Sequence, residues 1–218
     1  MSTDSSVEKK LVSIICRSIG RAELEQTLRS ANTQTYPNIE LILVDADDTE
    51  TGFLSKAECH SGAGKLHRAF SLFLFNEAGE LLLTQRSDSK RLWPGYWSNT
   101  CCSHPRKGES MAVATRRRLY DELNIEAPLE FVYKFSYQAE FGTTGSENEL
   151  CHVYLGRSNN SVIANEYEIS AIRYVAADSL LSEFDTTPDQ FTPWFKMEWL
   201  ALADEHRDVL SRYCDNQR

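Results

Sequence analysis

Short apolar runs bounded by turn-forming residues recur along this chain, and they predict strands more often than helices. A turn at 76–79 separates two of these runs, so we expect them to form a hairpin, and a second turn at 142–145 separates another pair. The predicted strands cover residues 11–16, 39–44, 67–75, 81–86, 131–140, 147–156 and 169–176.

Helical periodicity is confined to four segments. In the second of them Leu119 and Leu123 fall on one stripe, and the last begins with proline in its first turn, where proline is well tolerated. The predicted helices cover residues 22–30, 110–123, 177–184 and 193–213. Strands mixed with a few helices indicate an α+β fold or an α/β/α sandwich.

The N-terminal residues stand apart from this pattern. Residues 11–46 resemble the opening βαβ unit of family 2 glycosyltransferases. The segments that carry the resemblance are RAELEQTLRS and QTYPNIELILVDA. Only that opening is present, so the resemblance does not account for the whole chain. We predict an N-terminal appendage at 1–38 and a main domain at 39–218.

Length and charge narrow the classes of partner. The chain has 218 residues, enough for one domain with a short appendage, and a net charge of −9 with a pI near 5.1. That balance argues against nucleic acid or an anionic membrane as the main partner, and no apolar run approaches the length of a membrane span. An anionic substrate would need positive charge concentrated locally. The oligomeric state stays open.

The cysteine pattern indicates a reduced compartment. The six cysteines show no disulfide framework, Cys101 and Cys102 are adjacent, and we find no export signal. We therefore expect cytoplasmic thiols, most of them buried.

Three histidines and two glutamates form a candidate metal site. His60 and His67 flank a small flexible turn, His104 follows a cysteine pair, and Glu147 and Glu149 lie two apart on a predicted strand. That spacing points both carboxylates to one face. Such a set suits Mn²⁺, Mg²⁺ or Zn²⁺, and the nitrogen ligands disfavour a pure calcium or magnesium site. The alternative is a group of ordinary hydrogen-bonded polar residues.

The other candidate ligands are set aside. His152 belongs to the opposite face of the strand that carries Glu149, and His206 belongs to the terminal helix. Cys59 adjoins His60, but a buried structural thiol is the simpler interpretation.

The stretch 108–125 resembles a Nudix box, the helix-borne signature of an enzyme superfamily that acts on diphosphates. The spacing of the box is intact, but Ser103, Arg118, Asp121 and Asn124 depart from its residues, while Glu109 and Glu122 keep them.

Two of these departures have physical consequences. Asn124 tolerates the left-handed conformation that ends a helix. Arg118 puts a cation where the box has a metal-binding acid, and Glu122 lies one turn later on the same face. One carboxylate can still hold a divalent ion against a diphosphate, but the acidic cluster that activates water is depleted. Diphosphate hydrolysis is therefore disfavoured.

The departures and their surroundings resemble the type I isopentenyl-diphosphate isomerases. The matching words span about residues 40–200; they are HRAFSLFLFNEAGELLLTQRSDSKRLWPGYWSNTCCSHP, GES, RRLYDEL, FSYQAEF, ENELCHVY and DQFTPWF. The resemblance implies a Nudix-like α/β/α sandwich with a mixed sheet, two metal sites, a prenyl diphosphate substrate and a role in isoprenoid biosynthesis in the cytoplasm.

The resemblance also implies a role for each matching residue. Cys102 and Glu149 match the two catalytic groups, and Tyr137 and Trp194 match aromatic residues that line the hydrocarbon pocket. His60, His67, His104, Glu147 and Glu149 match ligands of Mn²⁺ or Zn²⁺. Glu122, helped by the Cys102 carbonyl, matches the Mg²⁺ ligand beside the diphosphate. The basic residues that match the diphosphate site are Lys56, Arg86, Lys90 and Arg118.

These residue types fit the reaction that the resemblance implies. Moving an unactivated double bond needs a proton added at one carbon and removed from another through a carbocation-like intermediate, with water excluded. The rival interpretations are a Nudix pyrophosphohydrolase and a catalytically inactive Nudix module that binds a diphosphate or a protein. The first gives no reason for Cys102 and three histidines, and the intact Cys102 and Glu149 argue against the second.

Overall fold

The computed structural model describes residues 39–214, so the elements expected at 11–16 and 22–30 and the appendage at 1–38 lie outside the described part. The elements of the described part are β1 (Glu40–Val44), β2 (Glu50–Ser55), α2 (Lys56–Cys59), β3 (His67–Phe75), β4 (Glu80–Arg86), β5 (Trp97–Ser98), β6 (Cys101–Ser103), α3 (Met111–Leu123), β7 (Leu129–Phe141), β8 (Gly145–Arg157), β9 (Ile169–Ala176), α4 (Ala177–Thr186), the 3₁₀ helix η1 (Pro188–Gln190), α5 (Pro193–Asp204) and α6 (Arg207–Cys214).

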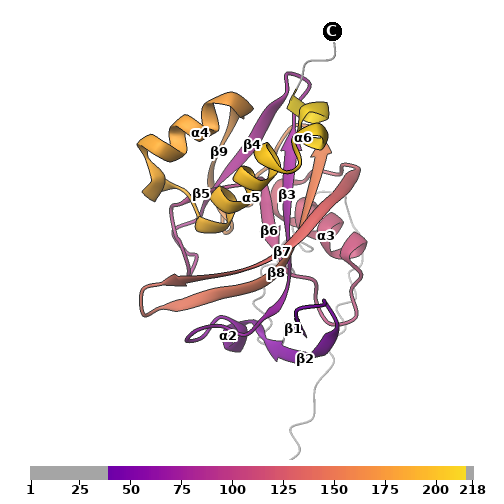
Figure 1. The fold of residues 1–218 in the computed structure, drawn as a ribbon, viewed down its shortest axis with the longest axis vertical. Coiled ribbons are helices and arrows are strands. Elements are labelled where there is room, and N and C mark those ends of the chain that lie inside the picture. The colour runs from indigo at the N-terminus through magenta and orange to yellow at the C-terminus, as the bar shows by residue number, and fades with distance from the viewer. Residues whose placement is uncertain (1–38, 215–218) are drawn as a thin grey trace, which may run out of the picture. The chain divides into compact units, whose positions relative to one another are not determined.

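A mixed sheet of nine strands is built around β3 (Figure 1). β3 pairs with β8 in parallel over its whole length, and β8 pairs with β7 in a long antiparallel hairpin. β1 and β6 pair antiparallel with other parts of β3, and β9 and β5 extend the sheet from β4. The mixture of parallel and antiparallel pairs agrees with the predicted sheet.

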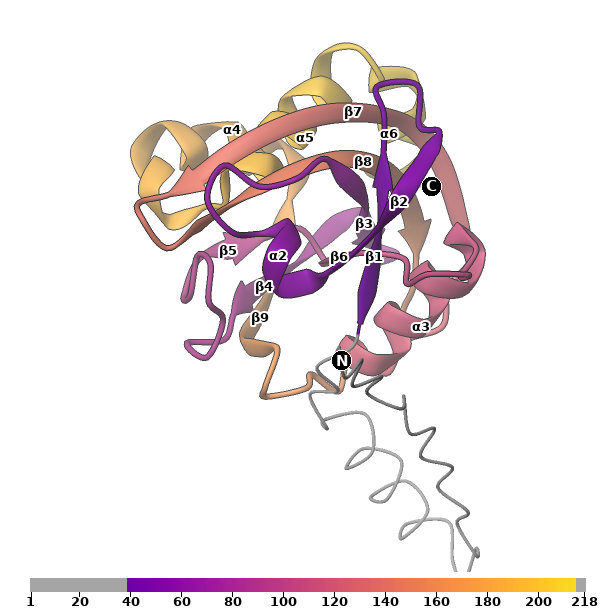
Figure 2. The same cartoon turned by 90° about the horizontal axis from the view of Figure 1, so that it is seen from below.

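Both faces of β3 are buried, because helices cover the sheet on both sides. Phe70, Leu72 and Leu74 pack with buried residues of α3, whereas Phe73 and Phe75 pack with those of α4, α5 and α6. Figure 2 shows α3 on one side of the sheet and the three C-terminal helices on the other. The predicted α/β/α sandwich is confirmed.

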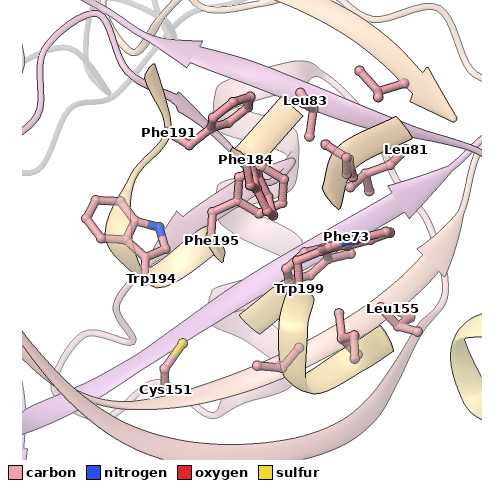
Figure 3. Packing of buried hydrophobic residues seen from close by; sticks show 14 of the residues in the cluster. Phe73, Leu81, Leu83, Cys151, Leu155, Phe184, Phe191, Trp194, Phe195 and Trp199 are labelled. Atoms are coloured by element: carbon pink, nitrogen blue, oxygen red, sulfur yellow. The ribbon is translucent and has the colours of Figure 1, made fainter. Parts of the chain in front are cut away.

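The layer under α5 is rich in aromatic side chains. Figure 3 shows Trp194, Phe195 and Trp199 of α5 facing the strands, with Cys151 of β8 in the same cluster. Phe73 on β3 lies 6.3 Å from Trp199, ring centre to ring centre, in a stacked arrangement. This packing fixes α5 against β3 and β8 and so fixes Trp194 at the first turn of the helix.

The strands predicted at 67–75 and 169–176 are observed with those bounds. The predicted hairpin between β3 and β4 closes at its turn, but the two strands pair only at Phe75 and Leu81 before they diverge to other partners. Sequence alternation does not reveal that β3 chooses β8 instead.

The helix predicted over 193–213 is wrong as a single element, because it breaks into α5 and α6. The amide of His206 bonds to the carbonyl of Ala201, five residues back, instead of continuing the α-helical pattern. The ring of His206 stacks on Tyr133 of β7 with centroids 4.4 Å apart, which holds the turn against the sheet.

Helix α3 ends at Asn124, as its sequence predicts, and a serine caps its start. The hydroxyl of Ser110 accepts a hydrogen bond from the amide of Val113, and Asn124 ends the helix in the left-handed conformation, with φ of 56°. Between these two caps, Arg118 and Glu122 lie one turn apart on the same face of the helix.

Candidate active site and metal centre

The site lies where the first residues of β3 meet β8, on the face covered by α5. In the parallel pair His67 is opposite Glu149, and Glu147 is two residues earlier on the same face of β8. His60 caps the end of α2, and His104 follows β6, whose Cys102 is opposite Ser71 on β3.

The five residues predicted as ligands converge. One nitrogen or oxygen from each of them lies within 4.8 Å of those of the other four. Glu149 Oε1 is 2.7 Å from His104 Nε2 and 3.7 Å from His67 Nε2, and His60 Nε2 is 2.8 Å from Glu147 Oε2. These five side chains are almost entirely buried.

The imidazoles are oriented as metal ligands are. The Nδ1 atoms of His60 and His67 lie 2.6 and 2.7 Å from the carbonyl oxygens of Lys56 and Lys65. Each Nδ1 therefore donates to a carbonyl, and Nε2 keeps its lone pair for the cluster.

Among the described residues, His67 Nε2 has no hydrogen-bond partner, and His60 Nε2 and Glu147 Oε2 have no polar partner other than each other. Burial lowers the pKa of His67 and lowers that of His104 well below its usual value, where neighbouring imidazoles add to the effect. Against the effect of burial, Glu147, whose Oε2 lies 2.8 Å from His60 Nε2, instead raises the pKa of His60. Imidazoles gathered against carboxylates, with unpaired buried atoms, are the donor set of a divalent cation site. The cluster therefore fits a divalent metal ion.

A glycine at the start of β8 keeps the His60 loop in place. A Cβ on Gly145 would lie 2.3 Å from the carbonyl oxygen of His60, and the amide of Ser146 donates to that same oxygen. The close approach requires glycine.

We therefore expect Gly145→Ala to displace His60 and to lower the affinity of the cluster for a divalent ion by at least about tenfold, since ligand geometry controls the affinity. Metal content after dialysis against a graded chelator measures this. Gly142→Ala is the matched control, because Gly142 also has positive φ but no atom within 4 Å of its Cβ position. Equal metal content in the two variants would contradict the prediction.

The sulfur of Cys102 is surrounded by hydrogen-bonding groups. Trp194 Nε1 lies 3.1 Å from it, the Ser71 hydroxyl 3.5 Å and the Ser98 hydroxyl 3.8 Å, while Asn99 Oδ1 lies 2.7 Å away and can accept the thiol proton. Burial raises the pKa of the Cys102 thiol to about 12. The Cys102 thiol therefore keeps its proton at neutral pH. The Trp194, Ser71 and Ser98 donors can hydrogen-bond to the thiolate when it forms.

Aromatic side chains connect Cys102 to Glu149. The Tyr137 hydroxyl donates to Glu149 Oε2 at 2.7 Å, and the rings of Tyr137 and Trp194 have centroids 6.3 Å apart. Burial and the nearby carboxylates hold the pKa of Tyr137 well above its usual value, so the hydroxyl keeps its proton. The four residues predicted as catalytic or pocket-lining thus form one continuous wall.

A small cavity beside Cys102 gathers the predicted basic residues. Its lining includes Arg86, Lys90, Cys102, Glu122 and Glu168. Arg118 binds both Glu122 and Glu168, and Lys90 binds Glu168. The cavity is therefore bordered by arginine and lysine side chains that are paired with glutamates.

Arg86 also contacts Trp194, and Lys56 lies near the same group of charges. The Arg86 guanidinium is 5.3 Å above the Trp194 ring and donates to the backbone carbonyls of Leu92 and Trp93. Desolvation, followed by the positive charges of Lys90 and Arg118, lowers the pKa of Lys56 to about 8. All four predicted diphosphate residues are thus brought to one region.

The sequence analysis missed several polar residues of this site. Ser71, Ser98 and Asn99 contact the Cys102 sulfur, Glu168 joins Lys90 to Arg118, and Glu198 lies buried behind them. Glu198 could have been found from the sequence, because it interrupts the apolar stripe of α5. Its neighbours on that stripe, Phe195, Trp199 and Leu202, are core residues.

The fold is a mixed sheet between helices, and helix α3 carries Arg118 and Glu122 beside a polar cavity. These are features of a Nudix domain, and residues 65–195 match the NUDIX domain family. A Deinococcus radiodurans protein of known structure has the same fold, with a TM-score of 0.60 at 23% identity over 81% of this chain and 99% of that one.

More similar proteins narrow the class. Isopentenyl-diphosphate Delta-isomerase 1 of Photorhabdus laumondii is 39% identical over 78% of this chain and 98% of its own length. The isopentenyl-diphosphate Delta-isomerase of Burkholderia multivorans is 42% identical over 77% of this chain and 96% of its own. This chain belongs to the isopentenyl-diphosphate Delta-isomerase family. Within residues 39–214, no helix has the length and apolar character needed to cross a membrane.

Proposed function

We propose that this chain interconverts isopentenyl diphosphate and dimethylallyl diphosphate and so serves isoprenoid biosynthesis. The observation that carries the proposal is the wall formed by Cys102, Trp194, Tyr137 and Glu149, which joins two proton-transfer groups through aromatic rings. Family membership agrees with this activity.

Cys102 and Glu149 supply the two proton transfers. One of them adds a proton to the terminal alkene carbon, which leaves a tertiary cation. The other removes a proton from the chain carbon next to the cationic carbon, on the diphosphate side. Trp194 presents a buried π face that favours the developing positive charge by roughly 1–2 kcal/mol. Tyr137 holds Glu149 in place and can relay its proton, and the aromatic walls exclude water.

Divalent ions complete the site in this proposal. His60, His67, His104, Glu147 and Glu149 would hold Mn²⁺ or Zn²⁺, and Glu122 with the Cys102 carbonyl would hold Mg²⁺ against the diphosphate. Bound there, the ions supply positive charge that tunes the proton affinity of Glu149 and neutralises the diphosphate. Lys56, Arg86, Lys90 and Arg118 bind the diphosphate, which anchors the substrate away from the reacting carbons.

Hydrolysis of a diphosphate is less compatible with the site. Arg117 donates two hydrogen bonds to the Glu109 carboxylate, at 2.6 and 2.8 Å, and Arg118 forms an ion pair with Glu122. The acids of the box are thus engaged by arginines, so they are poorly placed to activate water.

Incubation with isopentenyl diphosphate and Mg²⁺ in deuterated buffer tests the proposal. We expect dimethylallyl diphosphate with solvent deuterium in its new methyl group, observed by NMR, because the protein groups that transfer protons exchange with solvent. Release of phosphate from the substrate without rearrangement would instead identify a hydrolase.

We further propose that residues 1–38 are an appendage to the catalytic domain. The relatives are matched almost in full by about four-fifths of this chain, and Lys56 is the first proposed site residue. Removal of residues 1–36 should therefore leave turnover within about threefold of the full chain, measured by the same assay. Loss of activity with a folded product would show that the segment contributes to catalysis.

A cytoplasmic location and the absence of a nucleic-acid partner also remain predictions. The free thiols of Cys59, Cys101 and Cys151 and the net charge of −9 support them.

A further inference from the structure

Glu198 is a buried carboxyl group with no role in the mechanism above. It lies on the apolar face of α5 between Phe195 and Trp199, and its exposed fraction is 0%. Its Oε2 has no hydrogen-bond partner among residues 39–214. Burying a carboxyl with an unsatisfied oxygen costs free energy, and an apolar side chain of similar size would avoid that cost.

Two buried residues, Cys151 and Ser71, link the Glu198 carboxyl to the Cys102 sulfur. The Cys151 thiol lies 3.4 Å from Glu198 Oε1 and 3.5 Å from the Ser71 hydroxyl, and that hydroxyl lies 3.5 Å from Cys102 Sγ. Ser71 also lies close enough to the Glu198 carboxyl to lower its pKa against the larger effect of burial. Both Ser71 and Cys151 are fully buried, so water does not compete for these contacts.

The Ser71 hydroxyl has one hydrogen and more than one acceptor. If Glu198 were ionised, its carboxylate would attract that hydrogen away from the sulfur. A neutral carboxyl carries a hydrogen of its own. When the unpartnered Oε2 turns it toward Ser71 Oγ, the Ser71 hydrogen is left for Cys102. Burial raises the pKa of Glu198 to about 8, so the neutral form dominates at neutral pH.

We propose that Glu198 is a positioning residue for the isomerisation, which keeps the Ser71 hydroxyl turned toward the Cys102 sulfur. The sulfur then retains a donor when it carries negative charge during turnover. This inference rests on the proposed function, because it assigns Glu198 to the proton-transfer step.

Four variants of the full-length, metal-loaded protein test it: Glu198→Met, Glu198→Gln, Ser71→Ala and the double variant of Ser71→Ala with Glu198→Met. Glu198→Met and Ser71→Ala should each lower kcat about tenfold, the effect of one hydrogen bond to a charged atom, with KM within about twofold. Glu198→Gln keeps an N–H donor and should recover most of the loss. The double variant should be no slower than Ser71→Ala.

If Glu198 had only a structural role, its replacement would lower stability together with kcat, whereas the proposal predicts that kcat alone falls. Methionine removes an unsatisfied buried carboxyl, so Glu198→Met should unfold at the same or a higher temperature while its kcat falls. Equal kcat for the methionine and glutamine variants, or independent losses from Ser71→Ala and Glu198→Met, would overturn the proposal. If Glu198→Met does not fold, an unchanged kcat in Ser71→Ala overturns it alone.

A second readout separates this inference from the proposed function. The rate at which iodoacetamide alkylates Cys102, followed by peptide mass spectrometry, should fall severalfold in Ser71→Ala and Glu198→Met and recover in Glu198→Gln. If the unaltered protein fails to isomerise isopentenyl diphosphate, the proposed function fails, and the alkylation rates still decide whether Glu198 acts on the sulfur.

Discussion

Cys102→Ala should lower kcat with isopentenyl diphosphate by about three orders of magnitude, because a positioned acid or base contributes about 10²–10⁴-fold and water is kept from the carbon it serves. The variant should keep its divalent ions, since the Cys102 side chain lies outside the five-residue cluster. Steady-state turnover and metal analysis of the same preparation measure the two effects.

Cys101→Ala is the matched control, because Cys101 is the adjacent buried thiol and packs on the α3 side of the sheet. Its alanine variant should lose stability but little turnover. A Cys102→Ala protein with more than about a tenth of normal turnover would remove Cys102 from the proton transfers.

Glu149→Gln should lose both turnover and metal. The Glu149 carboxyl accepts from Tyr137 on one oxygen and lies against His104 on the other, so it belongs to the aromatic wall and to the ligand cluster at once. We expect kcat to fall by about 10³-fold or more and metal content after dialysis to fall with it. Turnover under saturating metal separates the two losses.

Glu147→Gln is the comparison, because Glu147 is in the cluster and Tyr137 donates to Glu149 instead. Saturating metal should restore Glu147→Gln much more than Glu149→Gln. Because Cys102 and Glu149 act on one intermediate, the double variant should be scarcely slower than either single one. Equal recovery of the two glutamine variants would limit Glu149 to metal binding.

Part of the five-residue cluster could be predicted from the sequence, because side chains two apart on a strand share a face. Glu147 and Glu149 share a face by their spacing, and the structure pairs Glu149 with His67 across parallel strands. The order of strands in the sheet could not be predicted in the same way. No residue pattern within β3 or β4 indicates that they pair at one position only and that β3 then lies beside β8. Such pairing is decided by packing between distant segments.

The missed polar residues have a different explanation. Ser71 and Asn99 are common residue types, and their importance arises only when β6 sets the Cys102 sulfur beside them. The break between α5 and α6 depends on the stacking of His206 upon Tyr133, a contact across many residues of chain. Helical periodicity alone continues through that break.

The ligand cluster has a consequence for how the chain is assembled. Its five side chains come from four separate segments, at the end of α2, the start of β3, the stretch after β6 and the start of β8. An ion held by all of them closes long loops, as a cross-link would, and it can do so only after the distant strands have met. Folding should therefore precede loading, and the melting temperature should rise with the concentration of free metal.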